Sequence, residues 1–304
     1  MLSVLIPVYN SNVVSLVTTI HTQAVSAALP FEIILLDDCS SAFIREHNQP
    51  VVSLPCVRYY ELKSNAGRAR IRNMLAGMAV YNSLLFIDCD AEVPSDSYIK
   101  NYLPWCNKEI VVYGGRIYQN IPPGKSEYLL HWRYGLQAEQ KSEEVRKRAP
   151  YLSFMTNNFL VSKTIMSNLS FDESITLYGH EDTLFGLELS RKGIPVEHIR
   201  NPLLHAGLEN AIAFLGKTTD GIGNLIMLVN NNKISPAEYD KIRLLNSYEL
   251  TKKYGLTGFY RFCFSVIEKK VLRNLKGNHP LIFLFNLYKL YLFIKLMKAG
   301  STNN

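Results

Sequence analysis

The stretch LLFIDCDAEV (residues 84–93) joins a run of apolar residues to two aspartates, Asp88 and Asp90. The apolar run has the length and composition of a buried β-strand. An aspartate buried without a partner is costly, so the carboxylates at the end of this strand need a cation, a hydrogen-bond donor or water. Which of these they have depends on what the fold places beside them.

Further apolar segments lie on both sides of this stretch, separated by helical patterns. Strands are expected over residues 3–8, 31–40, 56–64, 83–88 and 110–118, and helices over residues 13–28, 67–80 and 180–193. This alternation predicts an α/β fold with a mostly parallel central sheet covered by helices. The strands are continuously apolar, as expected when both faces of a sheet are buried. After Asn201 the pattern is helical throughout, which predicts a sheet domain over 1–210 and a helical C-terminal region over 211–304.

The composition is that of a folded protein, with 47% hydrophobic and 19% charged residues in 304. The net charge of +7 suits an anionic ligand or surface. Nucleic acid is not an expected partner, since no recognised binding motif accompanies the charge. Five cysteines without a CxxC pair argue against a disulfide framework and favour a reducing compartment. The N-terminal apolar run is too short for a signal peptide, so a cytoplasmic location is expected.

Polar residues follow three of the predicted strands. Tyr9 comes after the first strand, Asp38 after the second, and Asp88 and Asp90 after the fourth. In a parallel sheet, ligands bind outside the carboxyl ends of the strands. Asp38 alone is also explained by a helix cap. The acid pair favours a hard divalent cation, Mn²⁺ or Mg²⁺, because a bound ion offsets the repulsion between carboxylates and leaves positions open for a diphosphate.

Four motifs together carry a family resemblance. SVLIPVYN, EIILLDDCS, NAGRARIRN and LLFIDCDAE occur in the order and spacing of family 2 glycosyltransferases, which have the GT-A fold. The segment FDESITLYGHEDTLFGLEL (171–189) resembles the acceptor-side segment of that family. The resemblance covers about residues 1–210 and implies that this part is the catalytic domain. Residues 211–304 have no such support.

On the donor side, the resemblance implies a role for five positions. Pro7 would lie in the donor-binding site, Tyr9 would pack against the nucleotide base, and Asp38 would accept a hydrogen bond from the base. Arg72 would reach the base or the phosphates, and Asp88 would face the ribose.

The metal and the acceptor take five further positions by the same resemblance. Asp90 and His205 would bind the metal; a histidine in a satisfied core position is the alternative for His205. Asp182 would be the general base that deprotonates an acceptor hydroxyl, although an acid at the start of a helix is also explained by the helix dipole. Glu181 and Asn158 would lie on the acceptor side.

The last apolar segment, residues 280–298, is close to membrane-spanning length but is interrupted by Asn286, Lys289 and Lys295. Aromatic and aliphatic bulk combined with lysines predicts a helix at the interface of an anionic membrane. The alternatives are packing on its own domain and a contact with a second subunit in a homodimer.

The resemblance implies inverting, metal-dependent transfer of a sugar from a nucleotide-diphosphate donor, with a UDP-sugar favoured, to a hydroxyl of a glycan or lipid-linked acceptor. Surface polysaccharide assembly at the inner face of the membrane is the expected setting. One alternative is a non-catalytic membrane-associated protein that retains the fold, but its site acids would be expected to be lost. The other is a sugar nucleotidyltransferase, which needs a glycine-rich basic loop that PVYNSNVV lacks.

Overall fold

The computed structural model describes residues 1–301, with side chains described through residue 298. It divides into two compact units. The sheet unit comprises residues 1–119, 139–176 and 181–207, and the helical unit comprises residues 120–138, 177–180 and 208–304. The helical unit therefore includes two short segments that the sequence prediction placed in the sheet domain. Each unit is described separately below.

The sheet unit is built on seven strands in the order β3-β2-β1-β4-β8-β6-β9. The strands are β1 (Leu2–Val8), β2 (Phe31–Asp37), β3 (Val57–Glu61), β4 (Ser83–Ile87), β6 (Val111–Tyr113), β8 (Asn158–Ser162) and β9 (Val196–His198). The pairs among β1 to β4 and the β6–β9 pair are parallel, whereas β8 is antiparallel to both of its neighbours. The mostly parallel sheet predicted from the sequence is confirmed.

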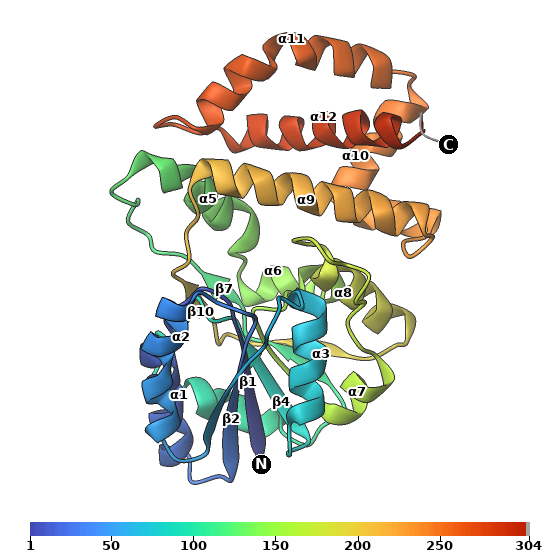
Figure 1. Cartoon of the computed structure of the whole chain (residues 1–304). Helices are drawn as coiled ribbons and strands as arrows, with labels where there is room; N and C mark the ends of the chain where they lie inside the picture. The colour runs from blue at the N-terminus through green and yellow to red at the C-terminus, as the bar shows by residue number, and fades with distance from the viewer. Residues whose placement is uncertain (302–304) are drawn as a thin grey trace. The chain divides into compact units, whose positions relative to one another are not determined.

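Helices cover both faces of this sheet (Figure 1). They are α1 (Val14–Ser26), α2 (Ala42–Asn48), α3 (Arg68–Met78), α4 (Tyr98–Tyr102), α6 (Glu143–Lys147), α7 (Lys163–Asn168) and α8 (Glu181–Arg191). Because successive side chains of a strand point to opposite faces, each strand supplies two hydrophobic clusters. Val4 and Ile6 of β1 pack with α1 and α4, while Leu5 packs with α3, α7 and α8. This double burial explains the continuously apolar strands.

A second, three-stranded sheet was not predicted. It has the order β5-β10-β7 and consists of β5 (Ala91–Glu92), β7 (Arg116–Ile117) and β10 (Leu203–His205). The prediction of wholly helical structure after Asn201 is wrong at β10, because three residues give too little pattern to distinguish a strand. β10 pairs antiparallel with β5, with His205 opposite Ala91. Strand pairing thus places His205 one residue from Asp90.

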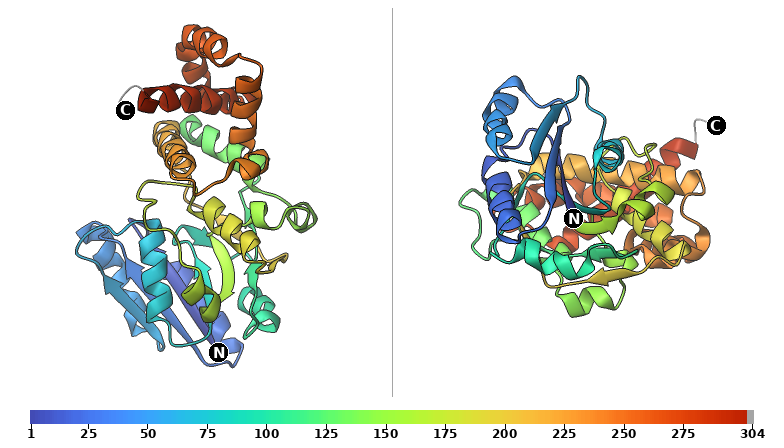
Figure 2. Two further views of the ribbon diagram at one scale, coloured as in Figure 1. Left: turned by 90° about the vertical axis from the view of Figure 1, so that its right-hand side faces the viewer. Right: turned by 90° about the horizontal axis from the view of Figure 1, so that it is seen from below.

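The helical unit contains α5 (Leu129–Tyr134), α9 (Ala211–Asn230), α10 (Arg243–Lys253), α11 (Thr257–Leu275) and α12 (Ile282–Ser301). Within this unit α12 lies between α9 and α11 (Figures 1 and 2). Among the described residues, α9 is the one helix long and apolar enough to span a membrane, and 39% of that stretch is buried.

The predicted interfacial helix over 280–298 can be compared with the packing of α12. Most of its bulky side chains are covered: Phe285, Tyr288, Leu290, Tyr291, Leu292, Phe293 and Ile294 are each less than a tenth exposed, whereas Phe283 is 69% exposed. Lys289 and Lys295 lie over aromatic rings of the same unit, although the Lys295 side chain is 53% exposed. The helix therefore packs mainly on its own unit, and an interfacial position for 280–298 stays a prediction.

Candidate active site

The loops after β1, β2 and β4 are tied together by hydrogen bonds at one edge of the sheet. The backbone N–H of Asn10 donates to Ser40 Oγ at 2.8 Å, and Ser11 Oγ donates to the carbonyl of Cys89 at 3.1 Å. The N–H of Asp38 donates to the carbonyl of Val8 at 2.8 Å. These bonds bring the predicted polar residues of three strand ends to one place, as the parallel sheet requires.

Asp88 lies among three arginines. Its Oδ1 accepts a hydrogen bond from Arg72 Nη2 at 2.7 Å, and its Oδ2 lies 3.8 Å from Arg68 Nη2 and 3.7 Å from Arg116 Nη2. The carboxylate is only 14% exposed, so these pairs act where screening by water is weak. The partners of Asp88 are therefore cations of the protein itself.

Asp90 has a different partner. Its Oδ2 lies 3.4 Å from His205 Nδ1 on β10. The backbone repeats this link, since the N–H of Ala206 donates to the carbonyl of Asp90 at 3.0 Å. Burial opposes ionisation, but His205 and then Arg116 hold the pKa of the Asp90 carboxyl well below its usual range. Asp90 is thus an anion at neutral pH.

The second oxygen of Asp90 bears on the predicted metal site. Asp90 Oδ1 is buried and finds no hydrogen-bond partner among residues 1–301. A buried, unsatisfied carboxylate oxygen calls for an explanation such as a bound ion. Carboxylate and imidazole side by side form a donor set that a divalent cation accepts. Through residue 298, no third His, Cys, Asp or Glu completes a cluster, so a cation here would keep positions open for water or ligand oxygens.

Glycine is required beside this pair. A Cβ built on Gly207 would lie 2.5 Å from Asp90 Oδ2 and 2.8 Å from Asp90 Cβ. Such contacts would displace the whole Asp90 side chain. Gly207 therefore sets the position of the carboxylate.

Two adjacent acids, Glu181 and Asp182, begin α8, and their surroundings shift their pKa values in opposite directions. Glu181 is 5% exposed and accepts a hydrogen bond from Arg68 Nε at 2.7 Å, with Arg72 Nη1 at 3.8 Å. Burial opposes its charge, but Arg68 and Arg72 lower the pKa of Glu181 to about 2. Burial and the nearby Glu181 carboxylate instead raise the pKa of Asp182 to about 6. Glu181 is a fixed anion, whereas Asp182 can take up a proton near neutral pH, as a general base must.

The backbone before these acids is unusual. Gly179 and His180 both have positive φ, of 92° and 68°. A histidine in this region is uncommon, and the conformation turns the chain sharply into α8. Asp182 Oδ1 then accepts a hydrogen bond from the N–H of Thr183 at 2.7 Å, which fixes the orientation of the carboxylate.

The remaining donor-side residues lie at the same strand ends. Tyr9 is 55% exposed, and Pro7 is half-buried in β1. Both oxygens of Asp38 accept backbone N–H groups, from Ala66 at 2.5 Å and Gly67 at 3.1 Å. Asp38 thus fixes the loop that leads into α3, although it caps neither α2 nor α3. A carboxylate has room for further donors, so its contact with a base stays a prediction.

Two predicted residues are not at the surface of the site. Asn158 is fully buried: its oxygen accepts the hydroxyls of Tyr98 and Tyr102 at 2.7 Å, and its amide donates to the carbonyls of Gly115 and Asn201 at 2.9 Å. An acceptor cannot replace these partners without disrupting the core, so the structure gives Asn158 a structural role instead. Arg72 is 2% exposed and lies beneath the site, between Asp88 and Glu181.

Arg116 is a site residue that the sequence did not reveal. It donates to Glu139 at 2.9 Å and faces Asp88 from β7. Although burial opposes its charge, Glu139 and Asp88 hold the pKa of Arg116 above its ordinary value. Tyr118, two residues on, also donates to Glu139 and packs edge-on against His205, with ring centroids 5.3 Å apart. The only signal in the sequence was an arginine within a predicted strand, which is too common to single out.

Replacing Arg72 by methionine is expected to lower the free energy of unfolding by about 3 kcal/mol. The change leaves Asp88 and Glu181 with one fewer cation in a buried position; Arg68 and Arg116 stay close, which limits the loss. Urea denaturation measures the difference. Arg70→Met is the matched control, because Arg70 is 62% exposed and 3.9 Å from Glu173, and should cost less than about 1 kcal/mol. Equal losses for the two variants would contradict this account of Arg72.

Comparison with known proteins identifies the family to which the chain belongs. The model of the family described as glycosyl transferase family 2 matches residues 3–166, more than half of the chain. The chain belongs to glycosyl transferase family 2. The resemblance expected from the four motifs is thereby confirmed.

Curated relatives share about a quarter of their aligned residues with this chain. Hyaluronan synthase of Pasteurella multocida is 25% identical over 229 residues, which cover 63% of this chain and 23% of that protein. Chondroitin synthase of Escherichia coli is 24% identical over 227 residues, which cover 63% of this chain and 32% of that protein. The chain thus spans about a quarter to a third of the length of these curated relatives.

Solved structures of similar shape confirm the GT-A fold. Mannosyltransferase PcManGT from Pyrobaculum calidifontis, in complex with GDP-Man and Mn²⁺, aligns with a TM-score of 0.56 and 12% identity over 97% of this chain and 87% of that one. S. aureus TarS aligns with a TM-score of 0.52 and 13% identity over 98% of this chain and 55% of that one.

Proposed function

We propose that this family 2 protein transfers a sugar, with inversion, from a nucleotide-diphosphate donor to a hydroxyl of a glycan or lipid-linked acceptor. The observation that carries the proposal is the convergence of two features in the sheet unit. Asp90 and His205 form a pair suited to a divalent cation, and Asp182 is a carboxylate with a pKa of about 6. Arg68 links the two regions, because it contacts both Glu181 and Asp88.

The residues of the chain divide the chemistry between them. Asp90 and His205 would hold Mn²⁺ or Mg²⁺, which when bound neutralises the charge of a diphosphate leaving group. Tyr9 is 55% exposed and would stack on the base, and Asp38 and Asp88 would orient the nucleoside. Arg68 is 37% exposed and is the arginine of the site best placed to reach a phosphate.

Asp182 supplies the proton acceptor for the attacking hydroxyl. An inverting displacement needs a carboxylate on the side opposite the leaving group, within reach of the acceptor hydroxyl. Its pKa of about 6 leaves most of the carboxylate ionised at neutral pH while keeping it basic enough to accept a proton. Glu181, held by Arg68 and Arg72, keeps the start of α8 in place.

The proposal also covers the identity of the donor, the kind of acceptor and the location of the protein. Among solved structures of similar fold, PcManGT was determined with GDP-Man and a form of TarS with UDP-GlcNAc, so both UDP- and GDP-sugars belong in a donor screen. We favour a UDP-sugar and surface polysaccharide assembly, because the curated relatives are synthases of hyaluronan and chondroitin. The protein would act in the cytoplasm, peripherally at the inner face of the membrane.

A screen of UDP- and GDP-sugars with and without Mn²⁺ tests the proposal. We expect one donor to be bound and slowly hydrolysed by the full chain, and to be transferred when a hydroxyl acceptor is added. Addition of EDTA should abolish the binding, and Mn²⁺ should restore it. Binding without any hydrolysis or transfer would favour the non-catalytic alternative. Synthesis of a nucleotide-sugar from a sugar phosphate and a nucleoside triphosphate would favour the nucleotidyltransferase alternative.

A further inference from the structure

The helix α11 in the helical unit is amphipathic, and its inner face packs against other residues of the same unit. Phe264, Val271 and Leu275 are buried, and the Phe264 ring stacks on Tyr291 of α12 with centroids 4.7 Å apart. Tyr260 donates its hydroxyl to the carbonyl of Leu287 at 2.9 Å. These contacts fix the rotation of α11 about its axis, and therefore fix which residues point outward.

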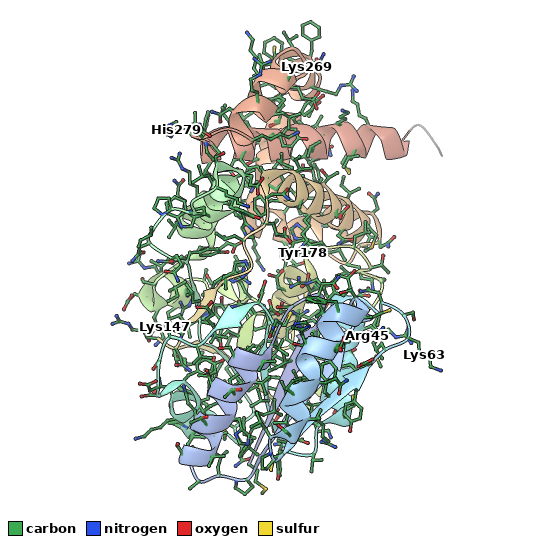
Figure 3. The ribbon with its side chains drawn as sticks, turned by 60° about the vertical axis from the view of Figure 1, so that its left-hand side comes forward. Arg45, Lys63, Lys147, Tyr178, Lys269 and His279 are labelled. Carbon is green, nitrogen blue, oxygen red and sulfur yellow. The ribbon has the colours of Figure 1, made fainter. Side chains whose placement is uncertain are left out.

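The outer face of α11 carries bulky apolar side chains in its first half and cations in its second half. We define this face by six residues at helical spacing: Phe259, Phe262, Val266, Lys269, Lys270 and Arg273. Phe259 and Phe262 are 68% and 69% exposed, and Val266 is 69% exposed. Lys269, labelled in Figure 3, and the other two cations are exposed as well. Isolated exposed apolar residues need no explanation, but three in one stripe of one helix indicate an interaction surface.

The charge around this face has one sign. Residues 251–281 contain seven Lys and Arg and one acidic residue, Glu268, whereas the whole chain has a net charge of +7. Glu268 is turned inward, where it accepts a hydrogen bond from the Tyr291 hydroxyl at 3.1 Å and lies 4.0 Å from Lys295 Nζ. The outer face therefore presents aromatic and aliphatic groups beside uncompensated positive charge.

We propose that the outer face of α11 binds the surface of an anionic lipid bilayer, with the helix lying in the plane of the membrane. A helix with aromatic residues on one side and lysines beside them binds at the interface by inserting the apolar groups and pairing the cations with lipid phosphates. The 19 residues of α11 span roughly 28 Å, so the helix touches several lipids at once. It is a different surface from 280–298, most of whose bulky apolar side chains are buried.

The inference rests on the membrane location given in the proposed function but not on the sugar transfer. It also commits to lipid over a second copy of the chain, because an identical basic face would repel its own copy. Vesicle binding is measured without donor or acceptor, so loss of catalysis and loss of membrane binding are separate results.

The test is flotation of the full-length protein with vesicles of phosphatidylcholine alone or with added phosphatidylglycerol. We expect binding to the anionic vesicles only, and release when ionic strength rises from about 0.05 M to about 0.5 M. The triple variant K269Q/K270Q/R273Q should weaken the partition roughly 100-fold. The variant F259S/F262S/V266S should weaken it by at least roughly tenfold.

Matched controls separate the face from general charge and hydrophobicity. K63Q/K100Q/K192Q removes three exposed lysines of the sheet unit, and Phe43→Ser removes an aromatic side chain that is 65% exposed; neither should change vesicle binding. Circular dichroism and donor binding should be unchanged in all variants, because every substituted side chain is exposed.

Three results would overturn the proposal. Equal binding to neutral and anionic vesicles would remove the role of charge. An unchanged partition for both α11 variants would exclude this face. A dimer that F259S/F262S/V266S separates, in a protein that binds no vesicles, would make the face a subunit contact.

Discussion

Replacing Asp182 by asparagine is expected to lower kcat for sugar transfer by about 10²–10⁴-fold, with donor affinity unchanged. Asparagine keeps the shape of the side chain and can still accept the N–H of Thr183, but it cannot take the proton of the acceptor hydroxyl. Steady-state transfer assays, with donor binding measured by calorimetry, separate the two effects. Asp96→Asn, at an exposed position, is the matched control and should leave kcat unchanged.

The pH dependence of the wild-type protein should report the same group. Only the ionised carboxylate accepts a proton, so kcat should fall roughly tenfold for each pH unit below about 6. The Asn variant should lose this limb of the profile. A variant that keeps both the rate and the acid limb would show that another residue is the base.

As pH rises, the contribution of Asp182 to stability should fall while activity rises. The pKa of Asp182 is raised in the folded state from 3.8 to about 6, so folding favours the protonated form. The stabilisation that this carboxyl provides is therefore present below pH 4 and is lost as pH rises through about 6. At pH 7 the Asn variant has no charge at position 182 beside the buried Glu181 carboxylate, and it should unfold at no lower urea concentration than the wild type. The loss of activity in the Asn variant would then come from the missing proton acceptor and not from unfolding.

Replacing Asp90 by alanine is expected to remove Mn²⁺-dependent donor binding. Loss of a residue that only supports a metal ligand lowers metal affinity roughly 10–100-fold, and loss of a ligand itself should lower it further. Asp90 provides the carboxylate of the proposed metal pair and the one buried side-chain oxygen without a hydrogen-bond partner among the side chains described through residue 298. Calorimetry of donor binding with added Mn²⁺ and with EDTA measures the change. His205→Ala should weaken Mn²⁺-dependent binding in the same way.

Gly207→Ala provides a second test that leaves both metal residues in place. The added Cβ would displace Asp90, so Mn²⁺-dependent binding should weaken although the donor atoms are all present. Gly77→Ala is the control, because a Cβ there meets nothing within 4 Å. Donor binding by the Asp90 variant that equals the wild type, with or without EDTA, would contradict the assignment of the metal site.

Several residues of the site were predictable because they follow strands whose direction the sequence reveals. Tyr9, Asp38 and Asp88 each come directly after an apolar run, and parallel strands place such residues at one edge. Asn158 was placed on the acceptor side because it follows the family pattern, but its surroundings decide its role. Its four hydrogen bonds come from residues as far as 60 positions away in the chain, and no local pattern indicates them.

The helical unit shows the same limit. The composition of residues 280–298 favours a membrane interface, yet the segment is the centre of its own unit. The hydrophobicity of a helix indicates that it will be buried, but not whether lipid, its own domain or another subunit will cover it. Residues 257–275 read as a moderately polar helix, and only the rotation fixed by Phe264 and Tyr260 leaves Phe259 and Phe262 pointing outward.

By itself, the sequence determined the family, the mostly parallel sheet and the strand-end positions of its acids, because these depend on local periodicity and on motifs short enough to be read directly. Tertiary structure alone decided the partners of those acids. Asp88 received three arginines from α3 and β7, and Asp90 received His205 through a three-residue strand 115 positions later in the chain. Charge and burial act through space, so the pKa of Asp182 and the open oxygen of Asp90 exist only once distant segments are packed together.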